Sequence, residues 1–353
     1  MASISGARRA SVTAMISHLS AVPLAHGGNL GAARQQFPGA PEPFVDLSTG
    51  INPHAYPVPR LSAEVFTRLP EPAAARRLSA IAAKAYGALS PTHVVAAPGT
   101  QILLPLVAAL VPPGRAAVLG PTYAEHVRVA ALVGHGASEV TDIGGLADAD
   151  LAIIVNPNNP DGRIFRKDVL LAVADQQKHR GGLLVVDEAF MDVGPADASL
   201  GGDAARGNIV VLRSFGKFFG LAGLRLGFAL AAPEIAAQLD ASLGPWAVAG
   251  PAIAIGEAAL ADVSWADATR ESLRRGAQRL DEMLTSAGLE VIGGTSLFRL
   301  VRATAASGLF HHLGRAGILV RRFAEQPTWL RFGLPGSEDA WFRLRSALAA
   351  FPR

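Results

Sequence analysis

The sequence predicts an α/β protein of three layers, in which helices cover both faces of a mostly parallel central sheet, followed by a smaller C-terminal α+β domain. Two observations predict it. Short β-branched runs alternate with Ala- and Leu-rich segments as far as about residue 245, which is the rhythm of parallel strands joined by helices. Half of the 353 residues are apolar, which is enough to fill two domain cores.

The expected elements follow the chain in order. Strands are expected at 92–98, 115–120, 150–156, 182–188, 208–214 and 225–231, with helices at 102–111 and 168–180. Beyond residue 245, a long helix is expected at 266–288, with short strands at 289–294, 296–302, 317–323 and 328–334. These segments divide the chain into a tail and arm (1–50), a large cofactor-binding α/β domain (51–245) and a small α+β domain (246–353).

Composition and charge exclude several classes of protein. The formal net charge is +3 and the arginines form only isolated pairs, so no basic stripe predicts nucleic-acid binding. There is no cysteine, which excludes disulfides and thiolate chemistry and fits a cytoplasmic location. The longest apolar run, ILLPLVAALV, is too short to span a bilayer and contains Pro105, so no membrane partner is expected.

The first residues of the chain are small and polar. Residues 1 to about 20 lack the apolar core of a secretory signal. The sequence therefore predicts a loose tail here, and Met15 is an alternative start to Met1.

Candidate site residues stand where apolar runs end, because ligands of an open parallel sheet bind beyond the carboxyl ends of its strands. The first such end is APGTQ, where Gly99 and Thr100 form a tight turn before a helix that begins near Gln101. Backbone N–H groups and a hydroxyl at a helix start form a cup for a phosphate. Taken alone, such a turn is more often an ordinary helix cap.

Two further strand ends carry amides and carboxylates. NPNNPDG places Asn156, Asn158 and Asn159 in a stiff turn, which by itself is typical Asx-turn chemistry. LLVVDE ends in Asp187 and Glu188, and a buried carboxylate needs a cationic partner. A metal ion or a protonated ring nitrogen would serve, but the absence of nearby residues at metal-ligand spacing disfavours the metal.

The fourth strand end, SFGKFFGLAGLRLG, places Lys217 among phenylalanines. A solvated lysine seldom has such neighbours, so we expect Phe215, Phe218 and Phe219 to form a dry wall around its amine. Burial penalises the ammonium form and lowers the pKa of a lysine from about 10.4 towards neutrality. The free amine is then available as a nucleophile.

Ser214 and Arg225 flank Lys217 with a hydroxyl and a guanidinium that could clamp one phosphate. An amine nucleophile, a buried carboxylate, an amide turn and a phosphate cup are the parts needed to hold pyridoxal 5′-phosphate (PLP). The order of the motifs GTQ, PTY, NPNNPDG, DEAF, SFGKFFGLAGLRLG and WLRFG resembles the fold-type-I PLP enzymes, the aspartate aminotransferase superfamily. This resemblance covers nearly the whole chain.

The resemblance implies a PLP-dependent transferase fold and a role for each matching residue. Lys217 would bind the cofactor covalently and later move a proton, Asp187 would pair with the pyridinium nitrogen, and Asn159 would hydrogen-bond the phenolic oxygen. Tyr123 would stack on the ring, and Arg331 would bind the α-carboxylate of the substrate. The cofactor phosphate would be held by Gly99, Thr100, Gln101, Ser214 and Arg225.

Within this superfamily, the N-terminal segment resembles the threonine-phosphate decarboxylases of cobalamin biosynthesis, relatives of the histidinol-phosphate aminotransferases. The resemblance rests on AHGGN (25–29) and FVDLSTGINPHAYPVP (44–59). Taken alone, His26 would be an ordinary loop histidine. The resemblance implies contacts to a phosphorylated substrate from His26, Gly28, Asn29, Asn52 and Arg321.

Three functions stay open. The first is PLP-dependent decarboxylation of O-phospho-L-threonine to (R)-1-amino-2-propanol phosphate. The second is a PLP-dependent aminotransferase of the histidinol-phosphate type, using the same residues. The third is a non-catalytic binding module, which the presence of both Lys217 and Asp187 disfavours. The resemblance also implies a homodimer whose active site is built across the subunit boundary.

Four positions depart from the superfamily pattern, so we expect details of the cofactor contacts to differ. Gly216 stands where a serine often precedes the lysine, and Asp161 replaces a threonine or serine. Phe190 replaces a tyrosine that hydrogen-bonds the cofactor, and Leu69 replaces a tyrosine that reaches the partner's cofactor phosphate. These changes favour a decarboxylase over a plain aminotransferase.

Overall fold

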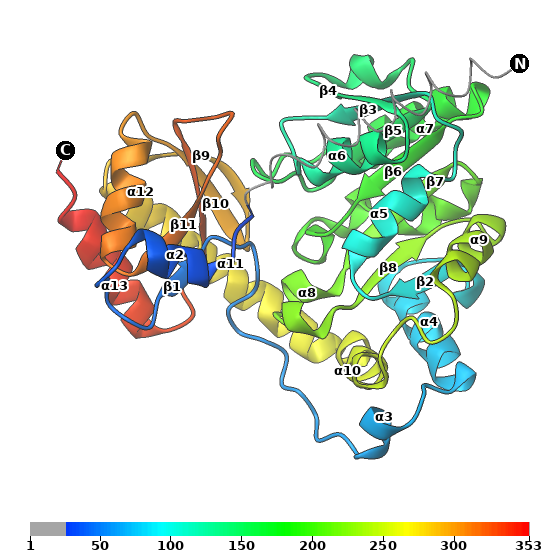
Figure 1. The fold of residues 1–353 in the computed structure, drawn as a ribbon, viewed down its shortest axis with the longest axis horizontal. Coiled ribbons are helices and arrows are strands. Elements are labelled where there is room, and N and C mark those ends of the chain that lie inside the picture. Colours follow the sequence, from blue (N-terminus) through cyan, green and yellow to red (C-terminus); the bar gives the residue numbers. More distant parts are fainter. Residues whose placement is uncertain (1–25, 353) are drawn as a thin grey trace, which may run out of the picture.

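Two β-sheets, each with its own helices, make up the protein (Figure 1). The computed structural model describes residues 26–352, so the predicted tail and the choice between Met1 and Met15 lie outside the described residues. A long helix, α11 (Val263–Ser286), runs from one half of the molecule to the other (Figure 1).

The larger sheet has seven strands, and every neighbouring pair is parallel except the two pairs made by β8. In spatial order the strands are β2 (Val94–Ala97), β8 (Gly227–Leu230), β7 (Ile209–Ser214), β6 (Leu183–Asp187), β5 (Leu151–Val155), β3 (Arg115–Leu119) and β4 (Gly136–Val140). The mostly parallel sheet expected from the sequence is confirmed. The strand β4 was not expected, because its residues GASEV lie at the sheet edge, are partly or fully exposed and form no apolar run.

Helices cover both faces of this sheet, because strand side chains alternate and make each face apolar. On one face α5, α6 and α9 pack, and on the other α4, α7 and α10. The helices are α4 (Pro72–Tyr86), α5 (Thr100–Ala108), α6 (Glu125–Leu132), α7 (Lys167–His179), α9 (Pro233–Leu243) and α10 (Gly250–Ala261). The expected helices at 102–111 and 168–180 are α5 and α7. No helix within residues 26–352 combines the length and apolarity needed to cross a membrane.

The smaller sheet has five strands, and its edge strand comes from the N-terminal arm. In spatial order they are β1 (Val45–Leu47), β11 (Ile318–Arg322), β12 (Trp329–Gly333), β10 (Phe298–Arg302) and β9 (Glu290–Thr295). Its helices are α2 (Leu30–Gln36), α12 (Ala306–Arg315), α13 (Glu338–Ala349) and the C-terminal part of α11. The four short strands expected after residue 288 are therefore confirmed.

Short elements complete the chain, and the expected domain boundaries at residues 50 and 245 stay predictions. β1, from the expected arm, pairs in parallel with β11, and α10, which follows residue 245, packs against α4. The short helices are α3 (Glu64–Thr67), α8 (Phe215–Phe218), η1 (Pro91–His93), η2 (Ile143–Leu146), η3 (Met191–Val193), η4 (Ala196–Ala198), η5 (Gly201–Arg206) and η6 (Ala222–Leu224).

A buried ion network joins β6, β7 and η3. Arg213 donates to Glu188 over 2.9 Å and to Asp192 over 2.6 Å, and all three side chains are at most 6% exposed. The ring of Tyr86 lies 4.4 Å from the Arg213 guanidinium. The carboxylate of Glu188, one of the two acids at the end of β6, thus finds its cation within the fold.

Replacing Arg213 by Ala should destabilise the protein by about 3–5 kcal/mol, because it leaves two buried carboxylates without their cation. Urea denaturation measures the loss. The matched control is Arg302→Ala, which removes an exposed ion pair with Glu290 and should change the stability by no more than about 0.5 kcal/mol. Equal effects of the two variants would show that the network contributes no more than a surface pair.

Candidate active site

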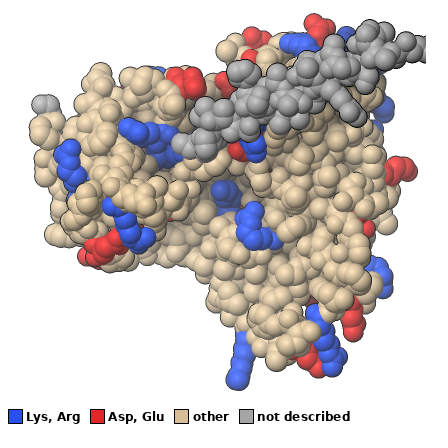
Figure 2. Space-filling view, in the orientation of Figure 1, with Lys and Arg blue, Asp and Glu red and all other residues tan. Residues whose placement is uncertain are grey.

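The predicted site lies where β5, β6 and β7 end, beside the smaller sheet. Lys217 follows β7 directly, in the single-turn helix α8 with Ser214 as its N-cap residue. A side chain at Gly216 would place its Cβ 2.8 Å from the Cα of Ala222, so this turn requires glycine. Figure 2 shows basic side chains in and beside the hollow between the two halves, which suits an anionic ligand.

The Lys217 amine lies in a dry and positively charged place. The pKa of Lys217 is lowered to about 8, first by burial and then by the charges of Arg331 and Arg225, while the charge of Asp187 opposes them. Its Nζ lies 5.8 Å from the centre of the Phe190 ring. A fraction of this amine is therefore neutral, and nucleophilic, at physiological pH.

The three phenylalanines of the expected dry wall pack against one another and against α11. The Phe215 and Phe219 rings stack at 4.4 Å, and Phe219 stacks on Trp265 of α11 at 5.6 Å. The Phe218 ring also lies against Trp265, at 5.5 Å. These rings anchor α8 to α11. The aromatic ring beside the Lys217 amine is that of Phe190. Consecutive residues of a helical turn point to different sides, so Lys217 and its neighbouring phenylalanines need not face the same way.

Asp187 is paired with His126, a residue that the sequence analysis missed. The distance between His126 Nε2 and Asp187 Oδ2 is 2.9 Å, and both side chains are buried. The other carboxylate oxygen accepts the N–H of Ala189 over 3.0 Å. His126 lies on α6, three residues after Tyr123. This closeness in sequence to Tyr123 is the one signal that could have pointed to His126.

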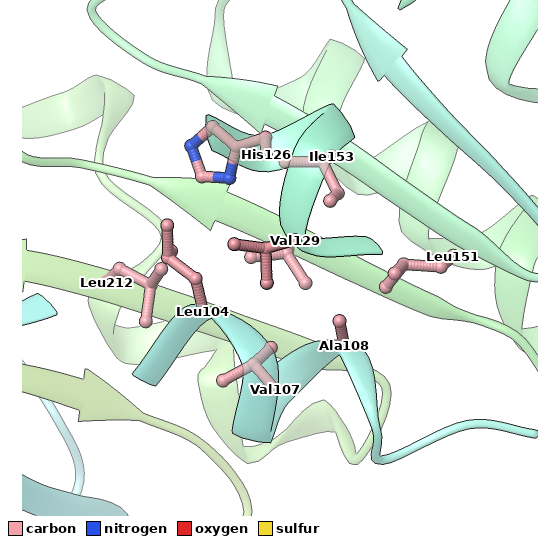
Figure 3. A pocket seen from close by; sticks show the side chains of 9 residues that line it. Leu104, Val107, Ala108, His126, Val129, Leu151, Ile153 and Leu212 are labelled. Atoms are coloured by element: carbon pink, nitrogen blue, oxygen red, sulfur yellow. The ribbon is translucent and has the colours of Figure 1, made fainter. Parts of the chain in front are cut away.

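An apolar cavity borders His126 and separates it from water. Figure 3 shows the imidazole at one end of this cavity, with aliphatic side chains from α5, α6 and the sheet around it. They are Leu104, Val107, Ala108, Val129, Leu151, Ile153, Val185 and Leu212. Among residues 26–352 no cluster of three or more His, Asp or Glu side chains could hold a metal ion.

Asn159 and Arg331 meet although they are far apart in sequence. Arg331 Nη1 donates to Asn159 Oδ1, and Nη2 donates to the carbonyl of Ser48 over 2.8 Å. The pKa of Arg331 is lowered to about 9, first by burial and then by the charge of Arg321, while the charge of Asp46 opposes them. The Arg331 Nε has no hydrogen-bond partner among the described residues. An anion such as a carboxylate would balance this buried charge.

The turn that carries Asn159 is held from both sides. Asn158 donates to Asp161 Oδ1 over 2.8 Å and accepts from the hydroxyl of Thr122 over 2.6 Å. Asp161 Oδ1 also accepts the backbone N–H of Arg163 over 3.0 Å. Asp161 thus closes the turn internally.

The residues of the predicted phosphate cup lie around Gly99, whose φ is +86°. A Cβ at Gly99 would lie 2.5 Å from Nη2 of Arg225, and one at Gly227 would lie 2.6 Å from the N of Thr100. Ser214 pairs with Gly227 across β7 and β8, which brings its hydroxyl to the same edge. Glycine at position 99 therefore lets the Arg225 guanidinium lie directly against the backbone at the start of α5, where N–H groups and positive charge suit a phosphate.

Tyr123 and Gln101 form one hydrogen-bonded unit beside the cup. The Tyr123 hydroxyl donates to Gln101 Oε1 over 3.1 Å. The pKa of Tyr123 is raised to about 12, first by burial and then by the negative charges of Glu125 and Asp187. Its hydroxyl stays protonated at neutral pH and keeps donating to Gln101.

The predicted substrate-binding residues fall into two groups. His26 and Arg321 lie near Tyr123: the His26 ring is 6.0 Å from the Tyr123 ring, and the charge of Arg321 lowers the pKa of that tyrosine. The others make local contacts. Asn29 caps α2 through the N–H of Ala32, Asn52 Nδ2 donates to the carbonyl of Phe218, and the N–H of Gly28 donates to Ser48. Their roles towards a substrate stay predictions.

Relatives of known name cover almost the whole chain. A threonine-phosphate decarboxylase of Sinorhizobium sp is 44% identical over 93% of this chain and 98% of its own length. A threonine-phosphate decarboxylase of Pseudomonas aeruginosa is 41% identical over the same shares. Among solved structures, a histidinol-phosphate aminotransferase of Sinorhizobium meliloti in complex with pyridoxal-5′-phosphate matches at a TM-score of 0.78, with 22% identity and 95% of each chain covered. This last likeness shows the fold.

The family described as aminotransferase class I and II matches residues 44–346. That range contains the lysine, the aspartate, the amide turn and the cup described above. The chain belongs to the aminotransferase class I and II family.

Proposed function

We propose that this chain is a PLP-dependent decarboxylase that converts O-phospho-L-threonine to (R)-1-amino-2-propanol phosphate and CO2, a step of cobalamin biosynthesis. One observation carries the choice of reaction: both near-full-length relatives named above are threonine-phosphate decarboxylases. The geometry of the site agrees with it, because a reactive amine, a buried carboxylate and a phosphate cup converge beside a buried arginine.

The described residues fit PLP. The Arg225 guanidinium lies against Gly99 at the start of α5, so its charge and the backbone N–H groups there would both be available to the cofactor phosphate. Asp187 is held by His126 and Ala189, and each of its oxygens keeps a second lone pair for a ring N–H. Lys217 would bind the cofactor, Asp187 would face its ring nitrogen, and Tyr123 would cover its ring.

The chemistry divides between the cofactor and the chain. When bound, PLP supplies a cationic ring that accepts the electrons of the bond broken at the substrate's Cα. Arg331, whose charge is poorly balanced within the fold, would hold the α-carboxylate. Lys217, with its lowered pKa, would return a proton from Nζ to Cα after CO2 has left.

The choice between decarboxylation and transamination depends on which bond at Cα stands perpendicular to the ring. An orientation preference of about 4 kcal/mol is enough to change the ratio of the two reactions a thousandfold. His26 and Arg321 would set that orientation by holding the substrate phosphate.

A homodimer is part of the proposal. Large apolar side chains are exposed on and just after α3 and shortly before α10: Phe66 and Leu69 are each 66% exposed, and Trp246 is 58% exposed. The helix α3, which carries Phe66, projects from the larger half and packs on α10 (Figure 1). Apolar side chains gathered in this way fit a subunit interface.

O-phospho-L-threonine supplied without a keto acid should yield CO2 and 1-amino-2-propanol phosphate in equal amounts, because decarboxylation needs no amino acceptor. Trapped CO2 and mass spectrometry of the product measure both. Lys217→Ala should lower turnover at least about a hundredfold. Turnover that requires 2-oxoglutarate would favour the histidinol-phosphate type of aminotransferase instead.

Covalent capture of PLP by the apoenzyme should slow below pH 8, because only the neutral amine of Lys217 attacks. The pKa of about 8 means that the rate falls about tenfold per pH unit below this value and levels off above it. Stopped-flow absorbance follows the capture, with Lys84→Ala as an unaffected control. A rate that rises up to pH 10.5, the ordinary lysine value, would contradict the lowered pKa.

Replacing both Phe66 and Leu69 by Glu should convert the dimer to a monomer, because it places charges in the apolar surface. Light scattering should then report half of the wild-type molar mass. Phe342→Glu, at an equally exposed position on α13, should leave the mass unchanged. A monomeric wild-type protein would end this part of the proposal.

A further inference from the structure

Glu125 is a buried carboxylate for which no role towards cofactor or substrate was predicted. It is the first residue of α6, and its side chain is 5% exposed. Burial by itself would raise its pKa, but the hydrogen bonds and charges of Arg128 and His26 outweigh burial and lower it. Glu125 is therefore an anion at neutral pH, at a helix start that favours negative charge.

Three separate segments donate to this carboxylate. His26 Nε2, from the arm, lies 3.1 Å from Oε1. Gln101 Nε2, from α5, donates to Oε2 over 3.1 Å, and Arg128 donates to the same oxygen over 2.6 Å. Because the Tyr123 hydroxyl donates to Oε1 of Gln101, the amide nitrogen of Gln101 is turned towards Glu125. The carboxylate thus connects the arm to the phosphate cup and to the ring-covering tyrosine.

The arm that carries His26 belongs otherwise to the smaller half. The Phe37 ring packs 5.7 Å from that of Phe310 on α12, and β1 pairs with β11. A Cβ at Gly314 would lie 2.3 Å from the Phe37 ring, so this end of the arm is closely fitted. The contact between His26 and Glu125 brings the arm onto the larger half beside Tyr123.

The contact with Glu125 fixes the orientation of the imidazole. An ionised carboxylate only accepts, so Nε2 of His26 carries a hydrogen and is occupied. Nδ1, on the opposite edge of the ring, can donate to a phosphate oxygen when it also carries a hydrogen, because phosphate oxygens only accept. The His26 side chain is 48% exposed, so a ligand can reach it.

We infer that Glu125 is a positioning residue that holds His26 ready for the substrate's phosphate. It acts on substrate affinity through His26 and takes no part in breaking the bond at Cα. This inference rests on the proposed function, because it concerns the phosphate end of that substrate. A buried carboxylate that orients a ligand-binding histidine through its other ring nitrogen is a common arrangement in proteins.

The test compares Glu125→Ala, His26→Ala and the double variant of the holoenzyme. Each single substitution should raise KM for O-phospho-L-threonine about tenfold, the effect of losing about 1.4 kcal/mol of binding, and change kcat less than about twofold. The double variant should be no worse than His26→Ala within about twofold, because both act on one contact. Effects that multiply to about a hundredfold, or that fall on kcat, would overturn the inference.

A binding measurement separates this role from one in folding or in cofactor binding. In a Lys217→Ala background, calorimetry should show the same tenfold loss of affinity for O-phospho-L-threonine when Glu125 is replaced, with unchanged affinity for PLP. Glu125→Gln keeps the shape of the side chain and serves if Glu125→Ala does not fold. An equal loss of PLP affinity would show that Glu125 acts on cofactor binding through Gln101, and it would overturn the inference.

The control is Glu290→Gln, which removes an exposed partner of Arg302 in the smaller sheet and should match the wild type. If the wild type decarboxylates the substrate but the Glu125 variants behave like this control, only the inference fails. If the wild type releases no CO2, the proposed function fails.

Discussion

The burial of the Lys217 amine near the Arg331 guanidinium is the constraint on which the rest of the site depends. Two cations in a dry place cost free energy, and the lowered pKa values of both groups express that cost. Asp187 offsets part of it, and an anionic ligand would offset more. The lysine follows β7 and the arginine lies on β12, so the charges approach only while the two halves stay together. The contact of Arg331 with Asn159 and Ser48 maintains that arrangement.

Two consecutive acids at the end of β6 serve different purposes because they point to opposite sides of the sheet. Asp187 meets His126 and looks towards the site. Glu188 meets Arg213 in the network beneath it. One dipeptide thus supplies a charge for chemistry and a charge for stability, each with its own partner. Because Arg213 directly precedes Ser214, the same network also fixes the strand end from which the reactive lysine follows.

The sequence predicted most of the sheet and the central site, and the failures have physical causes. Buried β-branched runs revealed their strands, whereas β4 is an exposed edge strand and gave no such signal. The packing partner of the phenylalanines around Lys217 was not predicted, because the direction of each ring depends on the helical turn and on Trp265, nearly fifty residues away. His126 and Glu125 were missed because their partners lie on other elements. Pairings of this kind are decided by tertiary packing, which motif spacing does not encode.

The arm also has a consequence for correct assembly. β1 contributes only three residues, yet it occupies the edge of the smaller sheet beside β11. Without it, β11 would present unpaired N–H and C=O groups, and an open strand edge is a template for pairing with other chains. During synthesis β1 emerges long before β11, so the strand that protects this edge is already available when its partner is made. The arm that contains His26 thereby also covers a strand edge that could otherwise pair with other chains and cause aggregation.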